Sequence, residues 1–166
     1  HARAGNAEAA VWLLETYQRA FTGPGMAVRE EARFSGLTVR DGRADGLSLE
    51  SALAAAAAVM ELLCHSMAGV LRIFPGVPDS WRDVSFRGMR AEGAFVVTAA
   101  RSGGRLDQVE IRSEAGCPLK LANPWGDVPV VVRREGAPPR HLRQRILELS
   151  TAPGEVLIVE NPAPSA

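Results

Sequence analysis

The fold of this chain is decided by residues 48–81, which read SLESALAAAAAVMELLCHSMAGVLRIFPGVPDSW. The first part of this stretch has a helical period and contains an unbroken run of alanines. After Gly69 the period changes to two, and Pro75 closes the alternating segment. We therefore expect a helix from Ser48 to Met67 that leads through Gly69 into a strand.

The predicted helix is apolar on nearly every side. Large apolar side chains recur at alternating spacings of four and three, which places them on one face. These residues are Leu49, Leu53, Ala56, Met60, Leu63 and Met67. A helix of this kind is normally buried by neighbours on several sides, so we expect an inner helix. An aspartate at Leu53 or Met60 is then expected to unfold the chain, because it buries an unpaired charge.

Three polar residues interrupt the apolar surface of this helix. Glu50, Glu61 and His65 fall on nearly one stripe, and the last two are an i, i+4 pair. One interpretation is a partly solvated edge of a packed helix. The other interpretation places Glu50 at the lining of a cavity, with Glu61 and His65 as buried support, because the alanines between them leave room. The sequence leaves both open.

A long segment without a helical period, residues 26–47, leads directly into the start of this helix. Loops of this length inside compact domains are uncommon and are often functional. The loop and the helix N-terminus meet at Glu50, which has the positive end of the helix dipole beside it. We therefore expect the candidate site of the chain at Glu50.

The remaining segments predict an amphipathic outer helix followed by short strands. The helix runs from Asn6, a suitable N-cap, to Thr22, and Gly23-Pro24-Gly25 ends it. The predicted strands are Val70–Phe74, Asp83–Met89, Ala94–Ala100, Leu106–Ser113, Leu119–Ala122, Val128–Arg134, Ile146–Ser150 and Glu155–Glu160. Short strands with turn residues between them are typical of an antiparallel β-sandwich.

Composition excludes several classes of function. Lysines and arginines balance aspartates and glutamates at 19 each, so no net field attracts nucleic acid or an anionic membrane. The longest apolar run is far below the ~20 residues that span a bilayer. Cys64 and Cys117 are too few for a disulfide framework, and the three scattered histidines show no metal-ligand spacing. We expect no cofactor and no metal.

Two ordered segments carry a family resemblance. Residues 62–99, LLCHSMAGVLRIFPGVPDSWRDVSFRGMRAEGAFVVTA, resemble the carboxyl end of family 95 glycoside hydrolases, the α-L-fucosidase and α-L-galactosidase family. Residues 109–125, VEIRSEAGCPLKLANPW, continue the similarity into the family's β-sandwich. The resemblance extends from Ser48 to Trp125.

The resemblance implies an α+β multidomain fragment. Residues 1–68 would be the terminal helices of an (α/α)₆ barrel catalytic domain, and residues 69–166 an antiparallel C-terminal β-sandwich. It also implies an inverting glycosidase with an oligosaccharide substrate, in a secreted or periplasmic protein. Inversion uses two carboxyl groups about 6.5–9.5 Å apart, one as general acid and one as general base.

The same resemblance names candidate site residues. Aligned without gaps, the family's base aspartate falls on Glu50, which makes Glu50 the candidate general base. With several residues inserted it falls on Asp45, the alternative. The family's general acid lies upstream of His1, so the expected partner is the remainder of the same polypeptide. Neither nucleic acid nor a membrane is expected as a partner.

Two other interpretations stay open beside this one. The chain can be a non-catalytic carbohydrate-associated module, or a purely structural helix-plus-sandwich unit. Trp81, Phe95 and Trp125 distinguish them, since an exposed row of aromatic rings favours sugar binding. The same rings buried between the sheets favour a bracing role, which is the usual place for aromatic residues on strands.

Overall fold

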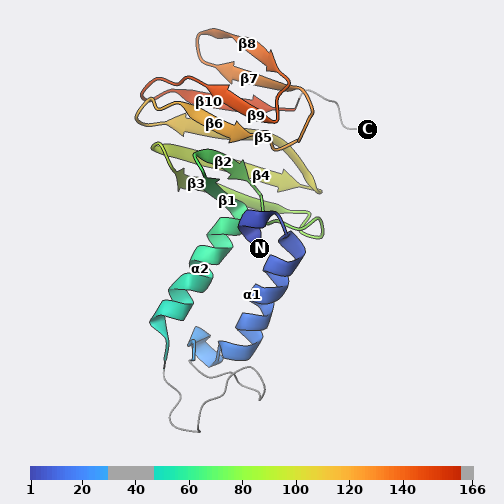
Figure 1. Cartoon of the computed structure of the whole chain (residues 1–166), viewed down its shortest axis with the longest axis vertical. Helices are drawn as coiled ribbons and strands as arrows, with labels where there is room; N and C mark the ends of the chain where they lie inside the picture. The colour runs from blue at the N-terminus through green and yellow to red at the C-terminus, as the bar shows by residue number, and fades with distance from the viewer. Residues whose placement is uncertain (30–46, 162–166) are drawn as a thin grey trace.

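The computed structural model describes residues 1–29 and 47–161. Two helices run side by side in opposite directions on one side of the molecule, and two β-sheets are stacked on the other (Figure 1). The amino terminus lies where the helices meet the sheets. None of the helices in the described ranges is long and apolar enough to cross a membrane.

The first helix forms as its sequence signals predict. A short 3₁₀ helix, η1 (Ala2–Ala4), precedes α1 (Ala7–Phe21). Asn6 caps α1, since its side chain accepts a hydrogen bond of 3.2 Å from the backbone N of Ala9. A second 3₁₀ helix, η2 (Pro24–Met26), follows at the predicted stop.

The second helix, α2, spans Leu49–Leu63 and begins at the predicted cap. The Ser48 hydroxyl accepts a hydrogen bond of 3.2 Å from the backbone N of Ser51. The predicted end at Met67 is wrong, because Cys64–Met67 forms a strand, β1, that pairs with β2 (Val70–Ile73). Ala68 and Gly69 form the turn with φ of 52° and 72°, the double positive φ of a two-residue hairpin.

The burial expected for α2 is not found within the described residues. Leu49, Leu53 and Met60 are exposed by 70 %, 62 % and 53 %, and Leu62 is the buried residue of this helix. The reason is geometric, because α1 lies along one side of α2 and leaves the apolar stripe of α2 open. The prediction that an aspartate at Leu53 or Met60 buries a charge is therefore wrong for this structure.

The strands form two sheets. The remaining strands are β3 (Val84–Ala91), β4 (Phe95–Ser102), β5 (Arg105–Ser113), β6 (Leu119–Ala122), β7 (Val130–Arg134), β8 (Ala137–Leu142), β9 (Ile146–Leu149) and β10 (Val156–Glu160). One sheet has the order β1-β2-β6-β9 and the other β3-β4-β5-β10-β7-β8. Neighbouring strands are antiparallel except β2 and β6, which are parallel where Leu71 faces Leu121.

The two sheets share one hydrophobic core. Leu71, Leu121 and Leu147 from the smaller sheet pack with Val109 and Ile111 from the larger one. Each is at most 2 % exposed, and burying such a side chain stabilises the fold by about 1.5–3 kcal/mol. Alternate residues along β4, β6, β9 and β10 and the second half of β5 enter this core, so the structure confirms an α+β chain whose sheets form a β-sandwich.

The last turn of α2 is joined directly to the smaller sheet. The backbone N of Phe74 donates to the carbonyl of Leu63 at 2.7 Å, and that of Gly76 donates to Leu62 at 3.1 Å. A Cβ at Gly76 would meet Leu62 Cδ2 at 2.6 Å and the Cα of Leu62 at 3.1 Å, so glycine favours this close approach. The predicted division between residues 68 and 69 falls in the turn between β1 and β2, and the division itself stays a prediction.

Candidate functional site

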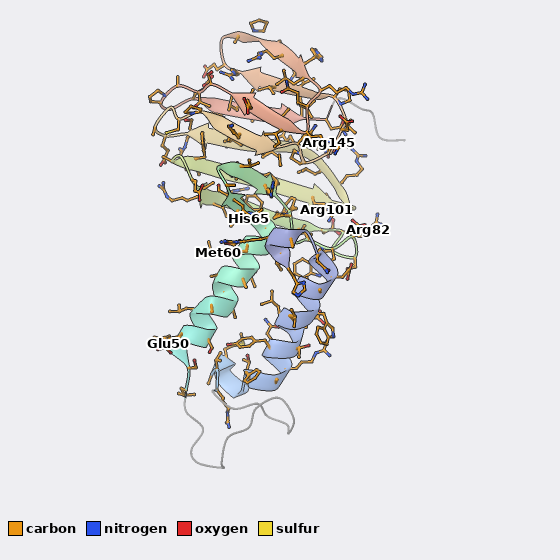
Figure 2. The ribbon with its side chains drawn as sticks, in the orientation of Figure 1. Glu50, Met60, His65, Arg82, Arg101 and Arg145 are labelled. Atoms are coloured by element: carbon orange, nitrogen blue, oxygen red, sulfur yellow. The ribbon has the colours of Figure 1, made fainter. Side chains whose placement is uncertain are left out.

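Glu50 lies in the first turn of α2, at the end of the helix pair far from the sheets (Figure 2). The Ser48 cap fixes the helix start, and a carboxylate in the first turn interacts favourably with the helix dipole. The Glu50 side chain is exposed. The alternative candidate, Asp45, lies outside the described residues. The role of either residue as general base stays a prediction.

The other acidic residue of the polar stripe is too far away to act with Glu50. Glu61 lies three turns further along α2, roughly 16 Å along the axis at ~1.5 Å per residue. An inverting pair needs carboxyl groups about 6.5–9.5 Å apart. Glu61 therefore cannot serve as the acid partner of Glu50.

Glu61 instead ties the amino terminus of the chain to α2. Arg3 Nε donates to Glu61 Oε2 at 2.8 Å, and Arg3 Nη2 donates to Oε1 at 2.7 Å. The bidentate hydrogen bonds from Arg3 hold the pKa of the Glu61 carboxyl below its ordinary value, against a smaller opposing effect of burial. A carboxylate engaged in this way is a structural group.

His65 is buried where α2 meets the sheets (Figure 2). The residue belongs to β1, and neither nitrogen of its ring has a hydrogen-bond partner among the described residues. Burial lowers the pKa of the ring below 6.5, and Arg72 and Arg3 lower it further, while Glu61 acts in the opposite direction. The ring is therefore neutral at neutral pH. His65 is buried, whereas Glu50 is exposed, and the role of His65 as support for Glu50 stays a prediction.

A cavity of about 480 Å³ lies between the two helices. Ala54, Ala57 and Ala58 of α2 face Leu13 and Leu14 of α1 across it. The alanines leave the room that their small side chains predict, and the volume lies within the range of ligand pockets. The lining is mostly apolar, which suits an apolar side chain better than a sugar.

A smaller cavity of about 380 Å³ lies at the junction, next to Glu61 and His65. Ser66 and Glu92 contribute polar groups to its lining, and Met60 contributes an apolar one. The backbone N of Glu92 donates to the Ser66 hydroxyl at 3.3 Å, which links β1 to the turn after β3. The cavity is thus framed by contacts between the helices and the sheets.

The described residues contain no group of three or more histidine, cysteine, aspartate or glutamate side chains able to hold a metal ion. Cys64 and Cys117 are both free thiols. Burial raises the pKa of the Cys64 thiol to about 12, so it stays protonated and unreactive at neutral pH. Cys64 therefore does not fit the role of a thiolate nucleophile.

Trp81, Phe95 and Trp125 do not form an exposed row. Phe95 is buried in the core, and Trp125 packs against the same core. The indole N of Trp125 donates to the carbonyl of Leu106 at 2.7 Å, which fixes the ring inside the sandwich. Trp81 alone of the three is at the surface, with 36 % exposed. The arrangement favours bracing over sugar stacking.

One group of functional interest was missed by the sequence reasoning. Arg140, Arg143 and Arg145 line a cavity of about 540 Å³ where the chain passes from β8 to β9. The only signal in the sequence is the density of arginines after residue 132. Their convergence depends on how the two sheet edges meet, which no local pattern shows.

Comparison with known proteins places this arrangement in a family. None of the curated proteins matches the chain. The family model described as "Glycoside hydrolase family 95, C-terminal domain" matches residues 65–159. The match covers more than half of the chain and extends from β1 to β10, so it includes both sheets of the sandwich. The chain therefore belongs to glycoside hydrolase family 95, as a C-terminal portion of that family.

Proposed function

We propose that this chain is the C-terminal part of an inverting glycosidase that acts on α-L-fucosides or related glycosides. Membership of glycoside hydrolase family 95 is the observation that carries the proposal, because it implies glycosidase activity at a coarse level. The choice of α-L-fucosides rests on the resemblance of residues 62–99 and 109–125 to that family's fucosidases and galactosidases.

The helical part of the chain would complete an (α/α)₆ barrel. The exposed apolar stripe of α2, with Leu49, Leu53 and Met60, supports this, as does Trp12 of α1 with 63 % exposed. Large apolar side chains exposed on two neighbouring helices fit a surface that another element covers. The covering partner in this proposal is the remainder of the same polypeptide, upstream of His1.

In this arrangement Glu50 is the general base and activates a water molecule. Its place in the first turn of α2 supports the role, because a helix end can present a carboxylate to an adjoining space. Asp45 is the alternative base. In this proposal the general acid comes from upstream of His1, as the family resemblance implies, because Glu61 is too distant from Glu50 and is held by Arg3. Without that acid, the departing oxygen is left unprotonated.

A second candidate function is a non-catalytic, structural sandwich. The burial of Phe95 in the core favours it, and so does the packing of Trp125 against that core with its indole N bonded to the carbonyl of Leu106. In this alternative the sandwich braces the helices through the junction at Leu62 and Leu63, and the chemistry lies elsewhere in the protein.

The experiment uses a polypeptide that contains this chain together with its upstream sequence. Glu50→Gln is expected to lower turnover of an aryl α-L-fucoside about 10²–10⁴-fold, because an amide cannot accept the proton of the attacking water. The melting temperature should hardly change. The matched variant Asp45→Asn should keep its activity.

Loss of turnover in Asp45→Asn but not in Glu50→Gln would transfer the role of base to Asp45. Full activity in both variants would contradict the catalytic proposal and leave the structural one. The 166-residue chain alone should not hydrolyse the substrate, and robust turnover by it would show that the general acid lies within it.

A further inference from the structure

Three arginines without an acidic partner gather at one edge of the sandwich. Arg140 lies in β8, and Arg143 and Arg145 lie in the segment that connects β8 to β9. Figure 2 shows Arg145 on the sandwich, away from the helices. Within the part of the chain that the structure describes, none of the three guanidinium groups forms an ion pair. This is a local excess of positive charge in a chain whose net charge is zero.

Two arginines on β7, the strand next to β8, do form ion pairs. Arg133 forms an ion pair with Glu160, and Arg134 with Glu155 at 3.0 Å. Glu160 on β10 and Glu155 just before it are thus already paired with arginines of β7. Arg140, Arg143 and Arg145 form no such ion pair with any described residue, which leaves their guanidinium groups available to a ligand.

A buried asparagine fixes the backbone that carries two of these arginines. Asn123 is 7 % exposed, and its Nδ2 donates to the carbonyls of Val128 at 2.9 Å and Gln144 at 3.2 Å. Its backbone N donates to the carbonyl of Arg145 at 2.9 Å. The connection is therefore held in one conformation before any ligand arrives, which reduces the entropy that binding has to overcome.

The arginines share their cavity with two carboxylates. Asp127 and Glu148 complete the polar lining of the space of about 540 Å³, which is large enough for a small ligand. Glu148 also forms an exposed ion pair with Lys120 at 3.1 Å. The site therefore offers donors matched to an anionic group and, beside them, acceptors for hydroxyl groups.

We propose that this cavity binds a uronic acid residue of an acidic oligosaccharide. Guanidinium groups bind a carboxylate in bidentate fashion, so Arg143 and Arg145 would hold the uronate carboxylate. Asp127 would accept hydrogen bonds from the ring hydroxyls. The same carboxylate repels a polymer with a dense row of anions, so nucleic acid and an anionic bilayer fit less well. The site lies in the sandwich and does not rest on the activity proposed for the helical part.

The test is an isothermal calorimetric titration of the 166-residue chain with tetragalacturonic acid and, separately, with its methyl ester. Each titration is carried out at about 50 and about 300 mM salt. The free acid should bind and its binding should weaken with salt. The ester keeps every hydroxyl but lacks the charge, and it should bind at least about tenfold more weakly, the effect of losing a charge-assisted contact.

Paired variants separate the site from overall charge. Arg143→Gln with Arg145→Gln should weaken binding of the free acid at least about tenfold. Arg87→Gln with Arg105→Gln removes the same charge from exposed positions on β3 and β5, and should change the affinity less than about twofold. Asp127→Ala should also weaken binding, because the hydroxyl acceptor is gone.

Several results would overturn the proposal. Equal binding of acid and ester would exclude recognition of the carboxylate, and equal losses in the two double variants would show unspecific attraction by charge. A gain in affinity for Asp127→Ala would show that the site prefers a bare anion. Tighter binding of duplex DNA or of phosphatidylglycerol vesicles, lost in the Arg143 and Arg145 variant, would show that the ligand of this site is another polyanion and not a uronate.

Discussion

The helical pair and the sandwich are built from equally regular apolar patterns, yet they satisfy these patterns differently. In the sandwich, alternate strand residues from both sheets meet in one core, and Val109 and Leu121 are fully buried. In the helices, Leu53 and Met60 are more than half exposed. The sandwich therefore contains its own partners, whereas Leu49, Leu53 and Met60 of α2 stay largely exposed within the described part of the chain.

This difference shows what a periodic pattern determines. The spacing of Leu49, Leu53 and Met60 defines a face of a helix, and that face exists. The pattern says nothing about which element covers the face. A strand pair brings its own neighbours through short turns, so pattern and burial coincide there. A helix needs a second element whose position is set far away in the sequence.

The largest expected effect comes from placing one aspartate in the sandwich core and one on the exposed face of α2. Val109→Asp should abolish folding, because an aspartate in the core costs more than about 4 kcal/mol. Leu53→Asp should lower the free energy of unfolding by only about 0.5–1 kcal/mol, the cost of helix propensity at an exposed position. Urea denaturation followed by circular dichroism measures both. Unfolding of Leu53→Asp would show that its face is covered.

A second pair of variants compares one buried and one exposed asparagine. Asn123→Ala should lower the global stability by about 1–3 kcal/mol, because the carbonyls of Val128 and Gln144 lose their donor. Asn6→Ala removes the cap of α1 and should act mainly on the first turn of that helix, by about 0.5–2 kcal/mol. Hydrogen exchange resolves the two effects. Global acceleration of exchange in Asn6→Ala would contradict the local role.

The junction of the two regions should be sensitive to pH. Burial lowers the pKa of His65 below its ordinary 6.5, so the unfolded chain binds a proton before the folded chain does. Stability should therefore fall as the pH decreases below about 6.5 and level off below the folded pKa. Melting temperatures between pH 7.5 and 5 should show this for the parent chain.

The control for this prediction replaces histidines one at a time. His65→Gln should lose the decline below about pH 6.5, whereas His141→Gln, at an exposed position of β8, should keep it. A further loss is expected from Glu61 below pH 4.5, because its pKa is lowered in the folded state, and melting temperatures extended below that pH should show it. Identical profiles for the two histidine variants would place the sensitivity elsewhere.

The smallest effect on stability is expected on the open face of α2. Leu49→Gln, Leu53→Gln and Met60→Gln together should leave the melting temperature nearly unchanged, because these side chains are exposed. The same variant should bind less of a hydrophobic fluorescent dye than the parent. Val156→Gln, an exposed apolar position of the sandwich, serves as the control. Undiminished dye binding would locate the apolar patch on another surface.

Local signals in the sequence predicted most of the elements. Asn6 and Ser48 cap the two helices as expected, and the alternating segments form strands close to their predicted bounds. These features depend on residues a few positions apart. The error at the end of α2 has the opposite cause, because Cys64–Met67 continues the helical spacing but pairs with β2 through a tight turn. Pairing across the hairpin outweighed the helical pattern.

The sequence reasoning missed β8 for a reason that the structure explains. Pro138 and Pro139 argue against a strand, since proline cannot donate to its neighbour. β8 lies at the edge of its sheet and pairs on one side with β7, where a missing donor can face solvent. The two candidate sites, at Glu50 and at the arginine cavity, also differ in whether a local pattern points to them. Glu50 was found from its place in a local pattern, whereas Arg143 and Arg145 converge through contacts of Asn123, which is distant in the sequence.

The continuous passage from α2 into β1 has a mechanical consequence. No flexible tether separates Leu63 from Cys64, and the carbonyls of Leu62 and Leu63 are held by the backbone after β2. A displacement of α2 would therefore act directly on β1, the edge strand of the smaller sheet. Expression of the sandwich from residue 65 onward would leave the amide groups of Phe74 and Gly76 without these partners. The two halves differ in how they are covered, but backbone hydrogen bonds of Phe74 and Gly76 join them across the junction.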